Sequence, residues 1–438
     1  MAKFIISGEH RLTGSIPVYG SKNAALPLLA ATLLTDQTVT LRNIPEIRDV
    51  AQMVLMLKAM GADVEQDGTS VTVAARTLDP SALPAHLVGT LRGSILLMGA
   101  LLGRTRTVSL PRPGGDIIGA RPIDVHLDGL RQLGARITIT DEIVHIDAHA
   151  AQANVIVLRE FSVTATENIM LLAATLSGRT TIHLAAAEPH VVALAHLLQA
   201  MGARISGAGT HTIIIEGKSA LHGTHFNNIS DMLEAGLFIL MAAATGSDMV
   251  IENVPFDTLH LFFKKLEDIG VDYTIHPEHN RVTVRPSRLA SFTMQSLPYP
   301  GIPTDLQAPF AVMATQARGS SLIHDPMYED RFKHIIELQK MGARAYVCDP
   351  HRVVVEGPAQ LRGREIPSLD IRAGATLIMA GLVAQGETII HKAEIIERGY
   401  ARLTERLQAV GAKITRAAED REPLDMALEK NHEFIPAP

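Results

Sequence analysis

The sequence predicts an α/β protein of two domains, each built from three βαβαββ repeats with buried first helices and outer sheets. A helix-ending signature, Leu-x-x-(Met/Leu/Ile/Val)-Gly, recurs six times along the 438 residues. Its glycines are Gly61, Gly134, Gly202, Gly270, Gly342 and Gly411. Subtracting these numbers gives spacings of 73, 68, 68, 72 and 69 residues. A chain of this length exceeds one ordinary core, so we expect three repeats in each of two domains.

In each repeat a strand is expected to lead into a helix that is apolar on nearly all sides and therefore buried, such as AALPLLAATLL at 24–34. A short strand follows, and then an amphipathic helix that should lie nearer solvent. This second helix ends at the signature glycine, where a left-handed backbone costs little. Two more short strands close the repeat, as in ARITITDEIVHID at 135–147.

Composition excludes several functional classes. The sequence is 47% hydrophobic and 20% charged, as in soluble globular proteins, and no apolar run approaches the roughly 20 residues that span a bilayer. The N-terminus lacks a signal-peptide pattern, and a single cysteine, Cys348, fits a reducing cytoplasm. We interpret Cys348, in the strand pattern YVCDP, as structural. A net charge of −6 with 4% aromatic residues argues against a nucleic-acid partner.

Four histidines are considered as candidate metal ligands. His126, His183, His190 and His324 form no HxxxH or HxH pattern, so we predict no metal site.

The start of each buried helix carries different polar residues. Two facing domains would bring six helix N-termini to one cleft, which favours anions. These positions hold, in chain order, Lys22 with Asn23, Arg92, Ser162 to Asn168, Asp231, Asp305, and Asp370 with Arg372. Asp231 and Asp305 could be helix caps or chemically active groups, and the pattern does not separate the two. Lys22, Arg92 and Arg372 are unfavourable at helix N-termini unless an anion binds there, so they indicate a small anionic ligand.

The second repeat contains an insertion. From its strand end to its signature glycine it takes 24 positions, Leu110 to Gly134, whereas the other repeats take 18 to 21. The extra residues, RPGGDIIGARP at 112–122, form a Gly/Pro-rich surface loop that contains Asp116 and ends on Arg121. A tolerated insertion is the simple alternative. A lone acid between paired glycines indicates instead that this loop is a lid that covers a bound ligand.

Seven blocks then occur in a fixed order: GSKNAALP (20–27), PGGDIIGARPIDVHL (113–127), SVTATENIM (162–170), PTDLQAPF (303–310), EDRFKH (329–334), DIRAGA (370–375) and ERGY (397–400). From Phe4 to about Ile414 the chain resembles the enolpyruvyl transferase family, in particular its members that act on UDP-N-acetylglucosamine. The resemblance implies two inside-out α/β barrel-like domains that close over substrate, with the first residues joined to the C-terminal domain. We expect one domain at 22–229 with the lid, a second at 1–21 plus 230–420, and a tail at 421–438 outside the repeat.

The resemblance also implies a reaction. Enolpyruvate would pass from phosphoenolpyruvate to the 3′-hydroxyl of UDP-N-acetylglucosamine, with release of phosphate and no metal or organic cofactor. This is the first committed step of peptidoglycan synthesis, which links the protein to cell wall biogenesis, cell shape and cell division.

Individual residues take roles by the same resemblance. The catalytic residues would be Lys22, Asp116, Asp305 and Arg398. Phosphoenolpyruvate would contact Lys22, Asn23, Arg121, Arg372 and Arg398. UDP-N-acetylglucosamine would contact Asn23, Arg92, Arg121, Pro122, Ile123, Asp124, Ser162, Val163, Asp305, Met327 and Arg331. Asp305 would take the hydroxyl proton, and Asp370 matches a further active-site position.

Four positions depart from the family pattern. Asp116 stands where most members have the lid cysteine that fosfomycin alkylates, so we expect a fosfomycin-insensitive protein. Glu160, Thr164 and Met232 replace a common Lys, Gly and Arg, all on the nucleotide side. Arg159 could stand in for the missing Lys.

These departures leave two alternatives open: a paralogous transferase with another acceptor, or a non-catalytic paralogue that binds a UDP-sugar. The joint presence of Lys22, Arg121, Asp305 and Arg398 argues against the non-catalytic alternative.

Overall fold

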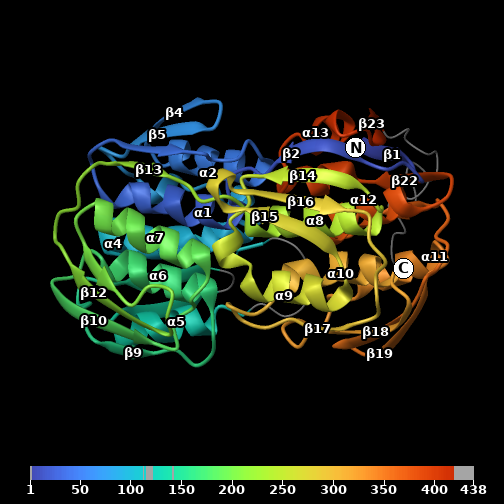
Figure 1. The fold of residues 1–438 in the computed structure, drawn as a ribbon. Coiled ribbons are helices and arrows are strands. Elements are labelled where there is room, and N and C mark those ends of the chain that lie inside the picture. Colours follow the sequence, from blue (N-terminus) through green and yellow to red (C-terminus); the bar gives the residue numbers. More distant parts are fainter. Residues whose placement is uncertain (1, 112, 115–121, 141–142, 419–438) are drawn as a thin grey trace, which may run out of the picture.

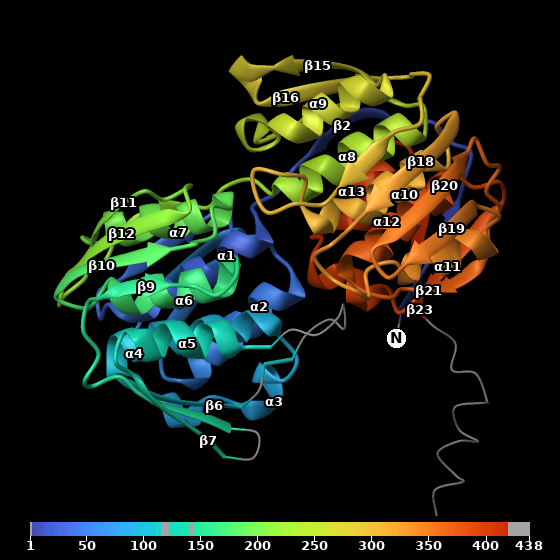
Figure 2. The ribbon, with the colours of Figure 1, turned by 90° about the horizontal axis from the view of Figure 1, so that it is seen from below.

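The computed structural model describes residues 2–111, 113–114, 122–140 and 143–418, which form two lobes (Figure 1). Each lobe has its own hydrophobic core. One core is drawn from residues 24–221, with Ala401 packed against it, and the other from 2–18 and 232–414. We call residues 22–229 the first lobe, and residues 2–21 with 230–418 the second. In Figure 2 the lobes lie side by side, with sheets on the outside of each. That they are separate domains with these boundaries stays a prediction.

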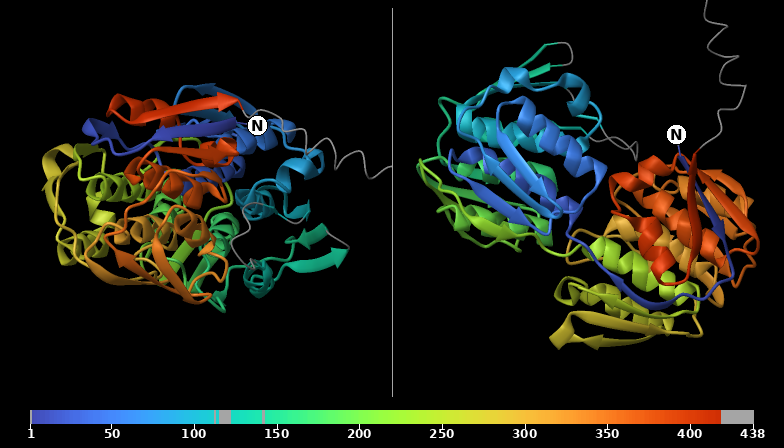
Figure 3. Two further views of the ribbon diagram at one scale, coloured as in Figure 1. Left: turned by 90° about the vertical axis from the view of Figure 1, so that its right-hand side faces the viewer. Right: turned by 90° about the horizontal axis from the view of Figure 1, so that it is seen from above.

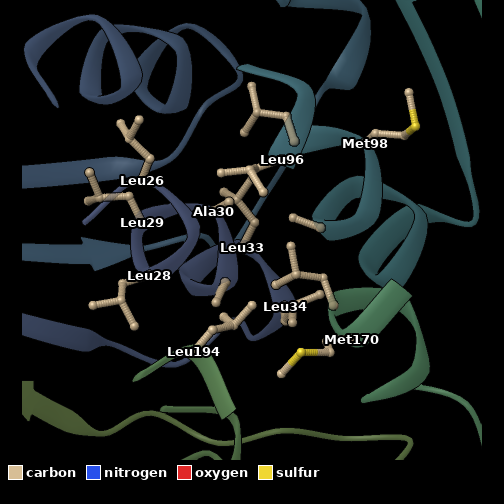
Figure 4. Close-up of a cluster of buried hydrophobic side chains, with 14 of the residues drawn as sticks. Leu26, Leu28, Leu29, Ala30, Leu33, Leu34, Leu96, Met98, Met170 and Leu194 are labelled. Atoms are coloured by element: carbon tan, nitrogen blue, oxygen red, sulfur yellow. The ribbon is translucent and has the colours of Figure 1, made fainter. Parts of the chain in front are cut away.

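Three buried helices form the centre of each lobe, as predicted. They are α1 (Lys22–Ala31), α4 (Leu96–Thr105) and α6 (Val163–Ala173) in the first lobe, and α8 (Met232–Ala244), α10 (Gln307–Ala314) and α12 (Ile371–Val383) in the second. Every residue of α8 and of α10 is buried, because both segments are apolar on all sides. Figure 4 shows Leu29 of α1 and Leu33 of the following short helix η1 (Thr32–Leu34) in this packing, together with Leu96, Met170 and Leu194 from neighbouring helices.

The second helices of the repeats are α2 (Arg48–Ala59), α5 (Asp124–Gln132), α7 (Pro189–Ala200), α9 (His260–Ile269), α11 (Lys333–Lys340) and α13 (Leu403–Ala409). Each leads to a signature glycine with φ between 84° and 111°, which confirms the predicted left-handed caps. The prediction that all six lie nearer solvent is wrong for α7. This helix packs on α1 and exposes His196 and Gln199 only, because PHVVALAHLLQA is apolar on most sides.

Among the residues that the structure describes, six sheets surround the helices. Those of the first lobe, in strand order, are β13 (His225–Asn227), β3 (Val39–Arg42), β5 (Ser70–Ala74) and β4 (Asp63–Asp67); β6 (Thr107–Pro111), β8 (Ile143–Asp147) and β7 (Arg136–Thr140); and β11 (Arg204–Ser206), β12 (Thr212–Gly217), β10 (Gly178–His183) and β9 (Val155–Val157). Those of the second lobe are β15 (Asp272–His276), β16 (Arg281–Arg285), β14 (Asp248–Glu252) and β2 (Thr13–Pro17); β17 (Thr293–Gln295), β18 (Gly319–His324), β20 (Arg352–Gly357) and β19 (Arg344–Asp349); and β21 (Glu365–Pro367), β22 (Glu387–His391), β1 (Ala2–Ser7) and β23 (Lys413–Ala418).

The second repeat differs from the predicted βαβαββ pattern. Its sheet has three strands over the described residues, and no strand leads into its buried helix there. The preceding segment forms instead η2 (Pro80–Ala82), α3 (Ala85–Val88) and η3 (Arg92–Ile95). Pro80 and Pro84 explain this, because proline cannot donate to a sheet ladder. The other short helices are η1 (Thr32–Leu34), η4 (Phe256–Thr258), η5 (Pro277–His279), η6 (Thr304–Leu306) and η7 (Ala393–Arg398).

Strands are exchanged between distant parts of the chain. β2 runs parallel to β14 in the second lobe, and β13 runs parallel to β3 in the first. β1 lies between β22 and β23, with Phe4 opposite both Ile390 and Arg416 (Figure 3). The first residues therefore belong to the second lobe, as the resemblance implied.

The chain passes between the lobes at 18–21 and again at 228–231, and the two passages are hydrogen bonded to each other. The Ser21 N–H donates to the Ile229 carbonyl at 2.7 Å, and the Asp231 N–H donates to the Tyr19 carbonyl at 2.9 Å. A Cβ at Gly20 would lie 1.7 Å from the Asn43 carbonyl oxygen, so only glycine fits. The connection between the lobes is thus a short, closely packed antiparallel pair of segments.

Candidate active site

A cavity of about 400 Å³ lies between the lobes and is lined by the starts of all six buried helices. This confirms that six helix N-termini meet at one cleft, and the volume suits a small-molecule site. The lining includes Lys22 and Asn23 from α1, Arg92 before α4, Ser162 and Val163 at α6, Met232 of α8, Asp305 before α10, and Asp370 with Arg372 at α12.

The structure separates helix caps from other polar groups. The Asp231 carboxylate accepts from the backbone N–H groups of Leu233 and Glu234 at 2.8 and 3.1 Å, so it caps α8. Asp370 caps α12 in the same way, accepting from Arg372 and Ala373 at 2.8 and 2.9 Å. Asp305 lies in η6 and makes no such cap. Of the two acids left open by the sequence, only Asp231 is a cap.

Asp305 is held between two arginines. Its carboxylate accepts hydrogen bonds from the Arg331 guanidinium and from Arg372 Nε at 3.1 Å, and these arginine side chains are only 8% and 7% exposed. Shielding from water raises the pKa of Asp305, but the two guanidinium charges and their hydrogen bonds outweigh this and hold it well below its usual range. The carboxylate is therefore ionised at neutral pH. It can accept a hydrogen bond from a hydroxyl, but it is a weak base until that hydroxyl becomes acidic.

Arg372 has a second partner at the far side of its guanidinium. Its Nη1 donates to the Tyr400 hydroxyl at 2.9 Å, and the Tyr400 ring lies under the cation at 5.2 Å. Burial, only partly offset by Arg372, raises the pKa of Tyr400 to about 12, so the phenol stays neutral. Arg372 is thus fixed in direction toward the cavity.

A second carboxylate, Asp49, contacts two further cations at the cavity wall. Its oxygens lie 2.6 Å from Lys22 Nζ and 2.9 Å from Arg398 Nε. Lys22 belongs to the first lobe and Arg398, in η7, to the second. Sequence reasoning missed Asp49, because an acid in the first turn of an amphipathic helix is common for dipole reasons alone.

The expected nucleotide contacts are placed only in part. Pro122, Ser162, Val163, Met327 and Arg331 line the cavity with Arg92, whose Nη2 donates to the Pro122 carbonyl at 3.5 Å. Ile123 and Asp124 do not line it; they stand at the start of α5, and Asp124 is exposed. Asp116, Arg121 and most of the predicted lid lie outside the described residues.

The unusual Thr164 has a partner. Its Oγ1 lies 2.8 Å from Nε2 of His126 on α5. Burial, with the nearby Arg92 charge, lowers the pKa of His126 to about 3, so this imidazole is neutral at physiological pH. Thr164 and Glu160 both line the cavity, as does Met232. All three departures on the nucleotide side therefore face the cleft.

Two side chains lie elsewhere than the sequence suggested. Arg159 does not line the cavity but pairs with Asp128 at 2.9 Å, with its side chain 74% exposed, so it does not replace the missing lysine. Cys348 lies in the strand β19 but is exposed, because it points from the outer face of an edge strand. The structure does not support the interpretation of Cys348 as structural, because its side chain is exposed.

A buried carboxyl group, Glu167, lies beside the half-buried Glu188 on the wall formed by α6 and α7, and sequence reasoning missed both. Glu167 is 1% exposed, and its Oε1 has no hydrogen-bond partner among the described residues. Burial, reinforced by the Glu188 charge, raises the pKa of Glu167 well above its usual range, so it is protonated. The neighbouring His190 has a pKa lowered by burial. Glu167, Glu188 and His190 all line the cavity.

The part of the chain that the structure describes contains no group of three or more His, Cys, Asp or Glu side chains placed to hold a metal ion. Within those same residues, no helix combines the length and apolar character needed to cross a bilayer.

The protonated Glu167 predicts a pH-dependent stability effect. Its pKa is raised in the folded state, so the wild type loses stability as pH rises above the unfolded value of about 4.3, by up to about 1.4 kcal/mol per pH unit. Glu167→Gln keeps a neutral side chain of the same shape and avoids this loss. We expect its melting temperature relative to wild type to be higher at pH 8 than at pH 5, measured by thermal unfolding.

The control for this experiment is Glu216→Gln, which changes a half-exposed glutamate on β12 that pairs with Arg204. It should show no comparable pH trend. If the difference in melting temperature between Glu167→Gln and wild type stays constant from pH 5 to pH 8, Glu167 is not neutral in the folded protein.

Comparison with known proteins gives consistent matches. The sequence model of EPSP synthase (3-phosphoshikimate 1-carboxyvinyltransferase) matches residues 6–407. A UDP-N-acetylglucosamine 1-carboxyvinyltransferase of Magnetococcus marinus is 42% identical over 95% of this chain and 99% of its own length. UDP-N-acetylglucosamine 1-carboxyvinyltransferase 2 of Listeria monocytogenes is 41% identical over 95% of this chain and 98% of its own.

Solved structures agree with the fold. The enolpyruvyl transferase NikO from Streptomyces tendae superposes with a TM-score of 0.86 at 26% identity, covering 96% of this chain and all of the other. EPSP synthase from Acinetobacter baumannii has a TM-score of 0.71 at 21% identity, covering 95% of this chain and all of the other, and supports the inside-out α/β fold alone. With a family match over most of its length and relatives above 40% identity, the chain belongs to the enolpyruvyl transferase family.

Proposed function

We propose that this transferase moves enolpyruvate from phosphoenolpyruvate to the 3′-hydroxyl of UDP-N-acetylglucosamine and releases phosphate. One observation carries the proposal: an ionised Asp305 lies in a single cleft with four cations drawn from both lobes, Lys22, Arg331, Arg372 and Arg398. Such a cleft suits a multiply anionic substrate beside a hydroxyl that must lose its proton. The relatives named for this reaction support the same acceptor.

Phosphoenolpyruvate would bind at the cationic side of the cleft. Lys22, Arg372 and Arg398 line the cavity, and we assign them to the phosphate and carboxylate groups together with Arg121. Asn23, at the second position of α1, would hydrogen-bond both substrates. Cations from two lobes gather around one anion, which favours closure of the lobes when that anion binds.

The reaction proceeds by addition and elimination. The 3′-oxygen of the acceptor bonds to C2 of phosphoenolpyruvate while Asp305 takes its proton, and C3 gains a proton to give a tetrahedral intermediate. Loss of the C3 proton and of phosphate then restores the double bond. We assign the proton donor for C3 to Asp116 of the lid.

UDP-N-acetylglucosamine would occupy the first-lobe side of the cleft. Arg92, Pro122, Ser162, Val163 and Met327 line the cavity there. We assign Arg121, Ile123 and Asp124 to the same nucleotide, and Arg331 to the sugar side through its bond to Asp305. A different acceptor is not favoured, because relatives with 41–42% identity carry the UDP-N-acetylglucosamine name despite the changes at Glu160, Thr164 and Met232.

The product is the first committed precursor of peptidoglycan. We therefore propose a role in cell wall biogenesis, with effects on cell shape and cell division. We place the enzyme in the cytoplasm, without membrane insertion or a nucleic-acid partner, because both substrates are phosphorylated metabolites.

The direct test is turnover. The protein is incubated with phosphoenolpyruvate and UDP-N-acetylglucosamine, phosphate release is followed, and the nucleotide product is weighed by mass spectrometry. We expect a nucleotide that has gained one enolpyruvyl group. Phosphate release only with another acceptor would show that UDP-N-acetylglucosamine is not the acceptor. No turnover by the folded protein would refute the transferase proposal.

Asp305→Asn should lower kcat by about 10²–10⁴-fold, the usual range for loss of a general base. The amide keeps the shape of the carboxylate but cannot take the hydroxyl proton. Asp330→Asn, which changes an exposed acid paired with Lys333 nearby, is the matched control and should stay near wild type. Turnover of Asp305→Asn within a factor of about three of wild type would exclude Asp305 as the base.

Fosfomycin should form no covalent adduct with the wild type, as judged by the intact mass, because the lid carries Asp116 and not a thiol. Asp116→Cys should gain the adduct and shift the pH optimum of kcat upward, since a thiol has a pKa near 8.5 and a carboxyl near 3.9. Both measurements are best made with Cys348→Ser as background, because Cys348 is an exposed thiol. An adduct on the Asp116 protein, or an unchanged pH profile of the Asp116→Cys protein, would contradict this role for the lid acid.

A further inference from the structure

Asp49 connects two cations that come from opposite lobes. One of its oxygens is 2.6 Å from Lys22 Nζ, and the other accepts from Arg398 Nε at 2.9 Å. We propose that Asp49 is a positioning residue that holds Lys22 and Arg398 side by side as one binding site for the anionic groups of phosphoenolpyruvate. The inference rests on the proposed function, because it concerns the substrate assigned there.

The local structure fixes Asp49 itself. It lies in the first turn of α2, where the helix dipole stabilises a carboxylate, and it is 1% exposed. Its two cations line the cavity, and so does Asp49. The carboxylate is therefore an anchored group at the cavity wall.

The two cations need such a group. Lys22 is the first residue of α1, where the helix dipole opposes a positive charge, and Arg398 brings a like charge to the same place. A buried carboxylate between them offsets both repulsions. Without it this constraint on the two flexible side chains is lost, and an arriving substrate would have to order them at a greater entropic cost.

Asp49 engages only part of each cation. A guanidinium has five N–H donors and an ammonium three, so the bond that each makes to Asp49 uses one donor. That bond fixes the position of each group, and both groups remain cationic. The bond to Arg398 uses Nε, at the inner edge of the guanidinium. An anion in the cleft can therefore meet cations that are already placed.

A buried pair with a purely structural role looks different. Arg406 donates to both oxygens of Glu234 at 2.7 and 2.8 Å, and both side chains are 5% exposed. That pair lies within the second lobe, and neither residue lines the cavity. The Asp49 cluster differs in joining both lobes and in opening to the substrate site.

The test compares steady-state constants of Asp49→Asn and wild type with both substrates. Asparagine keeps the shape and removes the charge. We expect the KM for phosphoenolpyruvate to rise about 10-fold or more, with a smaller change in kcat and an unchanged KM for UDP-N-acetylglucosamine. Arg398→Ala should raise the KM for phosphoenolpyruvate by a smaller factor in the Asp49→Asn background than in wild type, because both substitutions disrupt the same ion-pair cluster.

Asp49→Glu restores the charge on a side chain one methylene longer, so its KM for phosphoenolpyruvate should lie between those of wild type and Asp49→Asn. If Asp49→Asn fails to fold, Asp49→Glu decides, and at least a threefold rise is expected. Glu405→Gln, an exposed acid in the first turn of α13, controls for loss of a helix-dipole contact and should leave all constants unchanged.

An unchanged KM for phosphoenolpyruvate in Asp49→Asn, or a wild-type value in Asp49→Glu, would overturn the proposal. A lower KM would also overturn it, because Asp49 would then compete with the substrate. Failure of wild-type turnover would instead refute the proposed function, so the two failures are distinguishable.

Discussion

The pairing of buried cations with buried carboxylates is the interaction on which the cleft depends. Six helix N-termini already make this region positive, and several Lys and Arg side chains add to it. An unpaired charge there would be costly, so each group of cations is arranged around a resident acid: Asp305 for one group and Asp49 for the other. The cationic site is therefore already formed and stable before substrate binds. Residues of both lobes are needed to form it.

The same cleft keeps acids in opposite protonation states. Asp305 touches two guanidinium groups and stays ionised, whereas at Glu167 the charge of Glu188 adds to the effect of burial and the group stays protonated. Burial raises the pKa of both carboxyl groups, and the sign of the neighbouring charge decides whether that rise is reversed. One wall therefore carries a carboxylate that can accept a proton, and the other carries a neutral carboxyl group whose O–H can donate a hydrogen bond.

The repeated pattern made the architecture predictable. Apolar helices such as α8 and left-handed glycines such as Gly270 have clear periodic signals, and both are where the sequence placed them. Features of the fold that have no periodic signal in the sequence were not predicted. Periodicity does not give the partner of a strand, so the pairing of β13 with β3 was not predicted, and the strand expected before α4 is replaced by short helices at Pro80 and Pro84.

At the site, helix starts were predictable but side-chain partners were not, because ion pairs such as Asp49 with Arg398 join residues that are 349 positions apart. The lid acid Asp116 and Arg121 lie outside the described residues, so their roles stay predictions.

The position of β1 has a consequence for biosynthesis. Its edges are covered by β22 and β23, and the Ala2 N–H donates to Glu394, 392 residues away. A ribosome adds about 5–20 residues per second, so the first strand made waits roughly 20–80 s for its neighbours. The lobe at 22–229 contains all its own strands and can fold during that wait. Chains that end before β23 would leave β1 with an uncovered edge, which is a template for aggregation and a mark by which quality control can recognise incomplete products.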